Sequence, residues 1–312
     1  MTTFSGERPT QGRWRPLWML GVLVAVVWAL GPFVWSLRNS VMALEDTYKP
    51  LFIPFLQFRP TLQTWRFELI EQTVLTTALG RSLIVAVCHL MIVIPLGTLA
   101  GFALGRFRYR RPDNFNLTMW FLSQRFLPPA VIIIPYLLMM RSACGPIALP
   151  FGLWLPQPLQ LVCALEGDRT LLNTLSAITL AHVTFNLPFV ILIMRSIFAE
   201  MPREIEEAAK VDGASDLQIF RKIALPLAAP GLVAATLITF AFSWNEFLFA
   251  LILSGPSSQT LPLLIGAGEG VRSLDFPSVS VRALVAILPP VVMAVLTQRW
   301  IVRGLTLGAV KG

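Results

Sequence analysis

Long apolar runs separated by short polar segments dominate the pattern along this chain. A helix needs about 20 mainly apolar residues to cross the hydrocarbon of a bilayer. We predict a transmembrane helix over each run of that length: residues 17–37, 83–104, 117–140, 171–194, 230–253 and 279–302. The polar leader 1–16 precedes the first run, which is too long for a signal-peptide core and is expected to stay as an anchor. The pattern therefore predicts an all-α polytopic membrane protein with six spans, its transmembrane domain covering residues 17–312.

One more apolar stretch, residues 145–165, lies within the segment 144–170 between the third and fourth predicted spans. Four prolines within it remove backbone N–H donors at short intervals, so a helix there would break repeatedly. We expect an outward, interfacial or re-entrant insertion, with a seventh span as the alternative. Cys144 and Cys163 bracket this insertion, where a disulfide is chemically allowed and two free thiols are the alternative.

Composition agrees with a membrane location. The chain is 55% hydrophobic and 13% charged, with mean hydropathy +0.68, which is more apolar surface than one soluble core could bury. Most of its 25 lysines and arginines fall before the first span and after the second, fourth and sixth spans, which predicts that both termini lie in the cytoplasm. Because these cations form no continuous basic face, we expect no nucleic-acid partner despite the net charge of +8.

Several functions are disfavoured by motifs that the sequence lacks. None of the lysines follows a glycine, so no phosphate-binding loop of the Gly-Lys-Ser/Thr kind is present. His89 and His182 are the only histidines, and both fall in apolar segments, where a packed side chain is more common than a metal ligand. We therefore predict no catalytic residues, no metal site and no cofactor bound by this chain.

The polar segment 200–226, between the fourth and fifth predicted spans, predicts two short helices joined by a turn. Gly213 is a suitable C-cap for the first helix. Ser215 and Gln218 have the spacing of a capping box, which begins the second. The first helix starts with acidic residues that favour the positive end of its dipole. This helix, turn and helix has the form of a docking element.

The residue pattern of this segment is distinctive. Glu-Ala-Ala at 207–209 is followed by Gly213 and by Ile-Ala-Leu-Pro at 223–226. This spacing resembles the EAA signature of the permease subunits of ABC importers. Trp-Asn-Glu-Phe at 244–247 and the ending Gly-Ala-Val-Lys-Gly at 308–312 resemble the carbohydrate-uptake branch, and in particular the second permease of maltose-type systems. The long insertion 144–170 departs from the usual family pattern.

The resemblance implies a set of partners. Such a subunit pairs with a second, homologous permease in the bacterial inner membrane, among membrane lipid. A cytoplasmic ATPase dimer, which binds the ATP and Mg, docks on the EAA loop, and an extracytoplasmic solute-binding protein delivers a sugar or sugar-like solute. A permease for another solute class and a self-contained secondary carrier are the alternatives. A secondary carrier would show inverted repeats, and we see no convincing repeat.

Two groups of residues are candidates for contact with the ATPase. The coupling residues predicted from the loop are Glu206, Glu207, Ala208, Ala209, Asp212, Gly213 and Ala214. A solvated amphipathic loop is the alternative. In the tail, Gly308, Val310 and Lys311 are predicted to contact the ATPase, against the alternative of a disordered end.

Candidates for the solute path are polar groups inside predicted spans, because such groups are costly in hydrocarbon and normally face protein or water. They are Asn245, Glu246, Asn186, His182 and Arg125. His182 and Asn186 lie one helical turn apart, and Glu246 is the expected partner of Arg125. A structural polar network between helices is the alternative for each of them.

Overall fold

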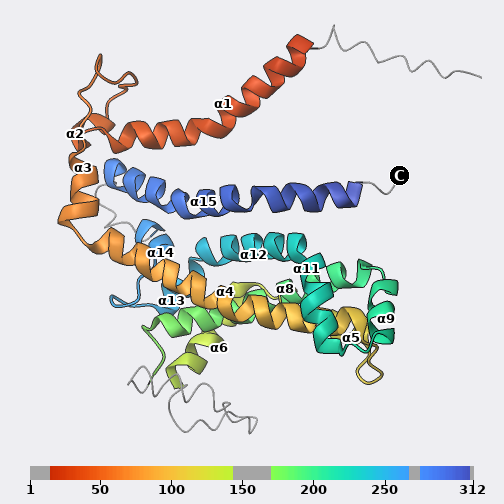
Figure 1. The fold of residues 1–312 in the computed structure, drawn as a ribbon. Helices are drawn as coiled ribbons and strands as arrows, with labels where there is room; N and C mark the ends of the chain where they lie inside the picture. Colours follow the sequence, from red (N-terminus) through yellow and green to blue (C-terminus); the bar gives the residue numbers. More distant parts are fainter. Residues whose placement is uncertain (1–14, 143–169, 267–274, 310–312) are drawn as a thin grey trace, which may run out of the picture. The chain divides into compact units, whose positions relative to one another are not determined.

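The structure is a computed structural model that describes residues 15–142, 170–266 and 275–309 (Figure 1). The chain forms two compact units, Met1–Gln72 with Glu269–Val285, and Thr73–Gly268 with Ala286–Gly312. The described residues of both units are helical and include no strand.

The first unit contains the N-terminal helices and the start of the last one. Its elements are α1 (Arg15–Ser40), α2 (Leu44–Thr47), α3 (Gln63–Arg66), the π-helix η1 (Phe67–Glu71) and the first turns of α15 (Phe276–Ala309). Glu68 and Arg282 form a buried bidentate ion pair, with N–O distances of 2.9 and 3.0 Å, which fixes η1 against α15.

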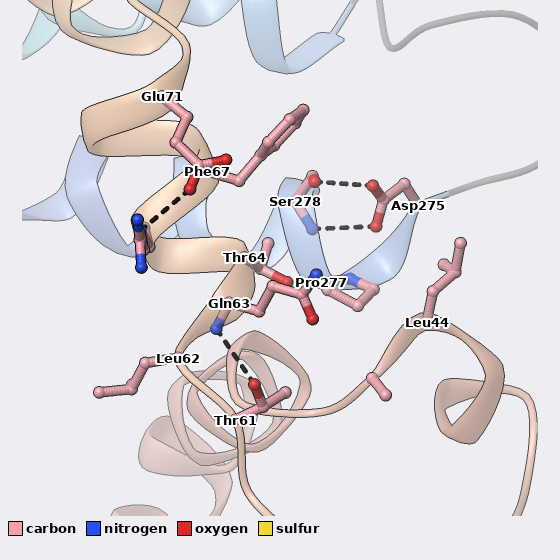
Figure 2. A pocket seen from close by; sticks show the side chains of 12 residues that line it. Leu44, Thr61, Leu62, Gln63, Thr64, Phe67, Glu71, Asp275, Pro277 and Ser278 are labelled. Atoms are coloured by element: carbon pink, nitrogen blue, oxygen red, sulfur yellow. Dashed lines mark hydrogen bonds and ion pairs between the residues drawn. The ribbon is translucent and has the colours of Figure 1, made fainter.

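Figure 2 shows a pocket of about 740 Å³ in this unit, lined by the α3 region and by the start of α15. Its carboxylates already have partners. Asp275 accepts hydrogen bonds from the backbone N–H and the hydroxyl of Ser278, at 3.1 and 2.7 Å, and Glu71 pairs with Arg66 at 3.0 Å. These acidic groups stabilise the local turns and leave no unpaired carboxylate in the lining.

The second unit holds most of the helices. They are α4 (Val74–Arg106), α5 (Asn114–Phe126), α6 (Pro129–Ser142), α8 (Leu175–Glu200), α9 (Glu204–Val211), α10 (Asp216–Ile219), the π-helix η2 (Phe220–Ala224), α11 (Leu225–Leu227), α12 (Ala229–Trp244), α13 (Leu248–Leu253), α14 (Leu261–Gly266) and the rest of α15.

Among the residues that the structure describes, four helices are long and apolar enough to cross a bilayer: Trp18–Ser40, Val74–Arg106, Leu175–Glu200 and Phe276–Arg299. Two further pairs pass the same test although they are bent, α5 with α6 by 94°, and residues Asp216–Leu227 with α12 by 74°. Counting each bent pair once gives six spans, which agrees with the predicted all-α polytopic fold.

Two of the predicted spans are not the continuous helices that their hydropathy suggests. The run 117–140 is broken between α5 and α6, where Pro128 and Pro129 cannot donate the backbone hydrogen bonds that a continuous helix needs. The run 230–253 is broken at Asn245–Phe247, between α12 and α13. The prediction of a single helix over each run was wrong for this reason.

The pair α4 and α8 forms the centre of the second unit. The glycines 97, 101 and 105 recur every four residues along α4 and let the two backbones approach closely. A Cβ placed on Gly101 would lie 2.6 Å from Met194 Cβ and 2.9 Å from the backbone nitrogen of Arg195. By contrast, a Cβ on Gly80, earlier in α4, would meet nothing within 4 Å. These two helices therefore pack through their backbones as much as through side chains.

Some of the predicted features lie outside the described residues. They are the leader up to residue 14, the insertion 144–170 except its last residue, with Cys144 and Cys163, and the tail residues Val310 and Lys311. Gly308 belongs to the last turn of α15. The remaining cysteine, Cys88, is exposed and free.

Candidate functional site

The loop between α8 and α12 contains a sharply defined elbow after α9. Gly213 adopts φ +82°, in the left-handed region that glycine reaches without strain. Its N–H donates to the carbonyl of Lys210 at 3.0 Å, and the N–H of Ala214 donates to that of Ala209 at 2.9 Å. This is the hydrogen-bond pattern of a Schellman motif, so the predicted glycine C-cap is confirmed.

The second arm of the elbow begins with the predicted capping box. The N–H of Ser215 donates to Gln218 Oε1 at 2.8 Å, and the N–H of Gln218 donates to Ser215 Oγ at 3.4 Å. The exposed ion pair Lys210–Asp216, 3.0 Å long, joins the two arms across the turn. The turn between the two arms is therefore fixed by contacts within the loop itself.

The outer surface of α9 is open to solvent, and no residue of the helix is buried. Glu207, Ala208 and Asp212 are exposed, whereas Ala209 and Ala214 are half-buried. Apolar side chains are exposed beside them: Ile205 is 43% exposed, Val211 88% and Leu217 62%. A cluster of exposed apolar side chains around a small-residue helix is typical of a surface that another protein covers.

Glu206 does not share that outward surface, although the sequence groups it with the coupling residues. Its Oε1 lies 2.6 Å from Nε of Arg106, at the end of α4, and the two side chains are only 15% and 4% exposed. Arg106 also donates to the carbonyls of Met201 and Pro202, at 3.1 and 3.3 Å. Glu206 therefore anchors α9 to the transmembrane helices instead of facing a partner.

An aromatic cluster fixes the other arm. Phe220, in η2, packs against Phe102 of α4 and Phe198 of α8, with ring centroids 5.0 and 6.3 Å apart. Sequence reasoning identified neither Phe220 nor Arg106 as part of the site. Arg106 stands in a run with Arg108, which we used only for topology, and a phenylalanine in an apolar segment carries no distinguishing signal.

The predicted path residues divide into a buried and an exposed group, and the buried group is a network around His182. Its Nδ1 lies 2.7 Å from Ser243 Oγ, and its Nε2 lies 3.3 Å from Glu246 Oε2. The carboxylate of Glu246 also accepts the N–H groups of Phe249 and Ala250, at 2.8 and 3.2 Å, and so caps α13. These contacts form a polar network between α8 and the segment that joins α12 to α13.

Asn186, one turn along α8 from His182, is likewise buried. His89 of α4 lies against His182, with the two rings edge to face and their centroids 5.8 Å apart. Within the described part of the chain, neither ring nitrogen of His89 has a hydrogen-bond partner. These side chains belong to the helix packing of the second unit.

The exposed group contains Arg125 and Asn245. The predicted pairing of Arg125 with Glu246 was wrong: Nη1 of Arg125 donates to the carbonyl of Phe185 at 3.2 Å. The guanidinium lies over the rings of Phe189 and Phe242, with Cζ 5.0 and 5.4 Å from their centroids. The oxygens of Glu246 instead contact His182 and the backbone N–H groups of Phe249 and Ala250.

Multiple apolar spans and an exposed, anchored elbow define a polytopic membrane protein of the transport-permease class. Residues 72–307 match the family described as binding-protein-dependent transport system inner membrane component, and the chain belongs to that family. The predicted resemblance to ABC-importer permeases is thereby confirmed.

Curated relatives match over nearly their whole length. The trehalose/maltose transport system permease protein MalG of Thermococcus litoralis is 29% identical over 96% of this chain and 97% of its own. The trehalose transport system permease protein SugB of Mycobacterium tuberculosis is 30% identical over 95% and 97%. A bacterial ABC transporter involved in alginate import contains a chain with the same fold, at TM-score 0.67 and 19% identity over 94% of this chain and 100% of that one.

Proposed function

We propose that this chain is the permease subunit of an ATP-driven, binding-protein-dependent importer for a sugar or sugar-like solute. The observation that carries the proposal is the elbow, in which Glu207, Ala208 and Asp212 are presented on an exposed helix anchored to α4. The sugar class is supported by the names of its relatives, which include permeases for trehalose, maltose and diacetylchitobiose. The protein resides in the bacterial inner membrane with both termini in the cytoplasm, in keeping with the positive-inside bias of its loops.

The elbow transmits movement from a cytoplasmic ATPase dimer, which binds the ATP and Mg. Displacement of α9 is passed to the end of α4 through Arg106, because that side chain holds both Glu206 and the carbonyl of Met201. The second arm passes movement to α4 and α8 through Phe220. A rigid element with two anchors suits a transition between two discrete arrangements of packed helices.

The remaining partners complete the path. A second, homologous permease supplies the other half of the channel, and an extracytoplasmic solute-binding protein delivers the solute. This chain carries no ATP-binding motif of the Gly-Lys-Ser/Thr kind, so it contributes path and coupling while the partner subunit hydrolyses ATP. The tail residues Gly308, Val310 and Lys311 add a second contact with the ATPase.

Reversing one charge on the elbow tests this function. The variant Glu207→Lys should lose solute-stimulated ATP hydrolysis and uptake in proteoliposomes that contain the ATPase, the second permease and the binding protein. Glu200→Lys makes the same charge change at an exposed position at the end of α8, outside the elbow, and should keep both activities.

Two outcomes would contradict the proposal. If Glu207→Lys assembles and transports like the wild type, the elbow is not the coupling element. If the wild-type chain takes up solute with no ATPase present, the protein is a secondary carrier. Co-purification of the ATPase and the second permease, measured on the same preparations, separates loss of docking from loss of membrane insertion.

A further inference from the structure

The break between α5 and α6 leaves an unusual surface inside a membrane span. Consecutive side chains from Arg125 to Val131 are exposed, and the two helices meet at 94°. The carbonyls of Gln124 and Arg125 lack the donors that a continuous helix would supply, since Pro128 and Pro129 have no N–H. Unpaired backbone groups of this kind are tolerated at membrane depth only beside protein or water.

The break between α12 and α13 exposes a second polar group. Asn245 is exposed, and its Nδ2 donates to the carbonyl of Ala241 at 2.8 Å, which leaves its amide oxygen pointing away from that bond. Phe242 precedes it by about one helical turn and is 43% exposed. The aromatic ring and the amide therefore share one face of this segment.

Arg125 joins the two breaks. Its guanidinium sits at the end of α5 and lies over Phe242, on the turn of α12 that precedes the other interruption. The ring of Phe189, from α8, holds the same guanidinium and packs against Phe242 with centroids 5.2 Å apart. Three helices thus meet at one exposed cation that has aromatic rings beneath it.

This cation has no acidic partner in the described chain. Its hydrogen bond to the carbonyl of Phe185 occupies one N–H and leaves the other guanidinium donors free. Glu246, the acidic side chain of the neighbouring break, is already bound by His182 and by two backbone N–H groups. An unpaired guanidinium is costly against lipid, so this face is expected to meet water or a ligand.

We propose that Arg125, Phe189, Phe242 and Asn245 form a solute-binding surface on the import path, selective for sugar-like solutes that carry a carboxylate, sulfonate or phosphate. The guanidinium binds the acidic oxygens, the amide binds hydroxyl groups, and the exposed ring of Phe242 covers the apolar face of the sugar. This proposal rests on the proposed function, because it places the surface on a path for solute. It separates Arg125 and Asn245, which are exposed, from His182 and Asn186, which are buried.

The test uses charged thiol reagents, so it does not depend on knowing the solute. Phe242→Cys is made in a chain whose Cys88, Cys144 and Cys163 are replaced by serine, and is assembled with the ATPase and the second permease in membrane fragments. The probes are two methanethiosulfonates, one with an anionic sulfonate head and one with a cationic trimethylammonium head. We expect both reagents to react with the introduced thiol. The ratio of the anionic to the cationic reaction rate should be roughly tenfold higher than for a thiol in free solution, because the full charge of Arg125 lies within a few ångströms.

Substitutions of the arginine show whether it causes this preference. Arg125→Gln should remove the roughly tenfold preference, whereas Arg125→Lys, which keeps the charge, should retain most of it. Ser257→Cys, in the exposed loop after α13, is the control thiol and should show the same reagent ratio in all three backgrounds. Asn245→Cys provides a second reporter position if Phe242→Cys does not assemble.

Three outcomes would overturn the proposal. If neither reporter thiol reacts, whether or not the ATPase holds nucleotide, then lipid or the second permease covers this face. Absence of a preference for the anionic reagent would indicate that a carboxylate of the second permease already neutralises Arg125. A preference that survives Arg125→Gln would have another cause. Failure to co-purify with the ATPase would instead contradict the proposed function, whatever the labelling shows.

Discussion

The helix pair α4–α8 and the elbow around α9 are held together in opposite ways. The pair is tightly packed: the glycines of α4 lie so close to α8 that a Cβ added at Gly101 would overlap Met194. The elbow has no buried residue in α9. It is held by the Arg106–Glu206 ion pair, the contacts of Phe220, an exposed ion pair, a glycine turn and a capping box. The difference suggests that α4 and α8 carry their own stability, whereas α9 keeps the open surface that our proposal assigns to contact with the ATPase.

The largest expected effect is a side chain forced into the closed pair. Gly101→Leu should destabilise the fold by about 3 kcal/mol, since the new Cβ would meet a backbone nitrogen that cannot move aside. The midpoint of thermal unfolding in detergent measures it. Gly80→Leu, in the same helix, places its Cβ in open space and should unfold near the wild-type temperature. Equal effects of the two variants would mean that close packing at Gly101 does not matter.

Breaking the anchor of the elbow should affect α9 and spare the helix pair. Arg106→Gln leaves the carboxylate of Glu206 largely buried without its partner, which costs about 3 kcal/mol of local stability. Amide hydrogen exchange across residues 202–212 should accelerate by roughly a hundredfold or more, while the amides of α8 stay protected. Arg108→Gln removes an exposed charge from the same run and should change neither region. Unchanged exchange in Arg106→Gln would show that the anchor is not needed.

Strain in the glycine turn should cost less stability than loss of the Arg106 anchor. Gly213→Ala imposes a Cβ on a left-handed residue and should cost about 1 kcal/mol, with no clash because open space surrounds the position. Exchange at the N–H groups of residues 213 and 214 measures it. Gly213→Asn should cost less than Gly213→Ala, because asparagine tolerates this conformation better than alanine. The reverse order would mean that the turn does not keep its left-handed form.

The smallest effect is expected at the capping box. Ser215→Ala removes the acceptor for the N–H of Gln218 and should cost about 0.5–1 kcal/mol in the second arm. Exchange at the amide of Gln218 reports it directly. Ser215→Asp keeps an acceptor at the N-cap and should preserve the protection of that amide. If the alanine variant is equally protected, the second arm is held by Phe220 rather than by its cap.

The elbow was predictable from sequence because its determinants are local. Gly213, Ser215 and Gln218 act on backbone groups only a few residues away, so their spacing alone specifies the turn. The anchor was not predictable in this way. Arg106 and Glu206 are 100 positions apart, and nothing in the arginine run marks one member as the partner of a distant carboxylate.

The spans show the same limit. The length of each apolar run predicts that it crosses the membrane, but an average over the run does not register Pro128 or the Asn245–Phe247 interruption. The contact of Arg125 with Phe189 and Phe242 depends on how three helices meet after those breaks. Our expectation of an Arg125–Glu246 pair failed because opposite charge alone does not specify which groups become neighbours.

The burial of the Arg106–Glu206 pair has a consequence for how the protein responds to dissolved ions. Salt screens exposed charges over a Debye length of about 10 Å at 0.1 M, but it acts much less on a pair withdrawn from water. The exposed pair Lys210–Asp216 is therefore weakened as ionic strength rises, while the anchor at Arg106 is largely spared. We therefore expect the orientation of α9 to persist at ionic strengths that weaken the surface pair.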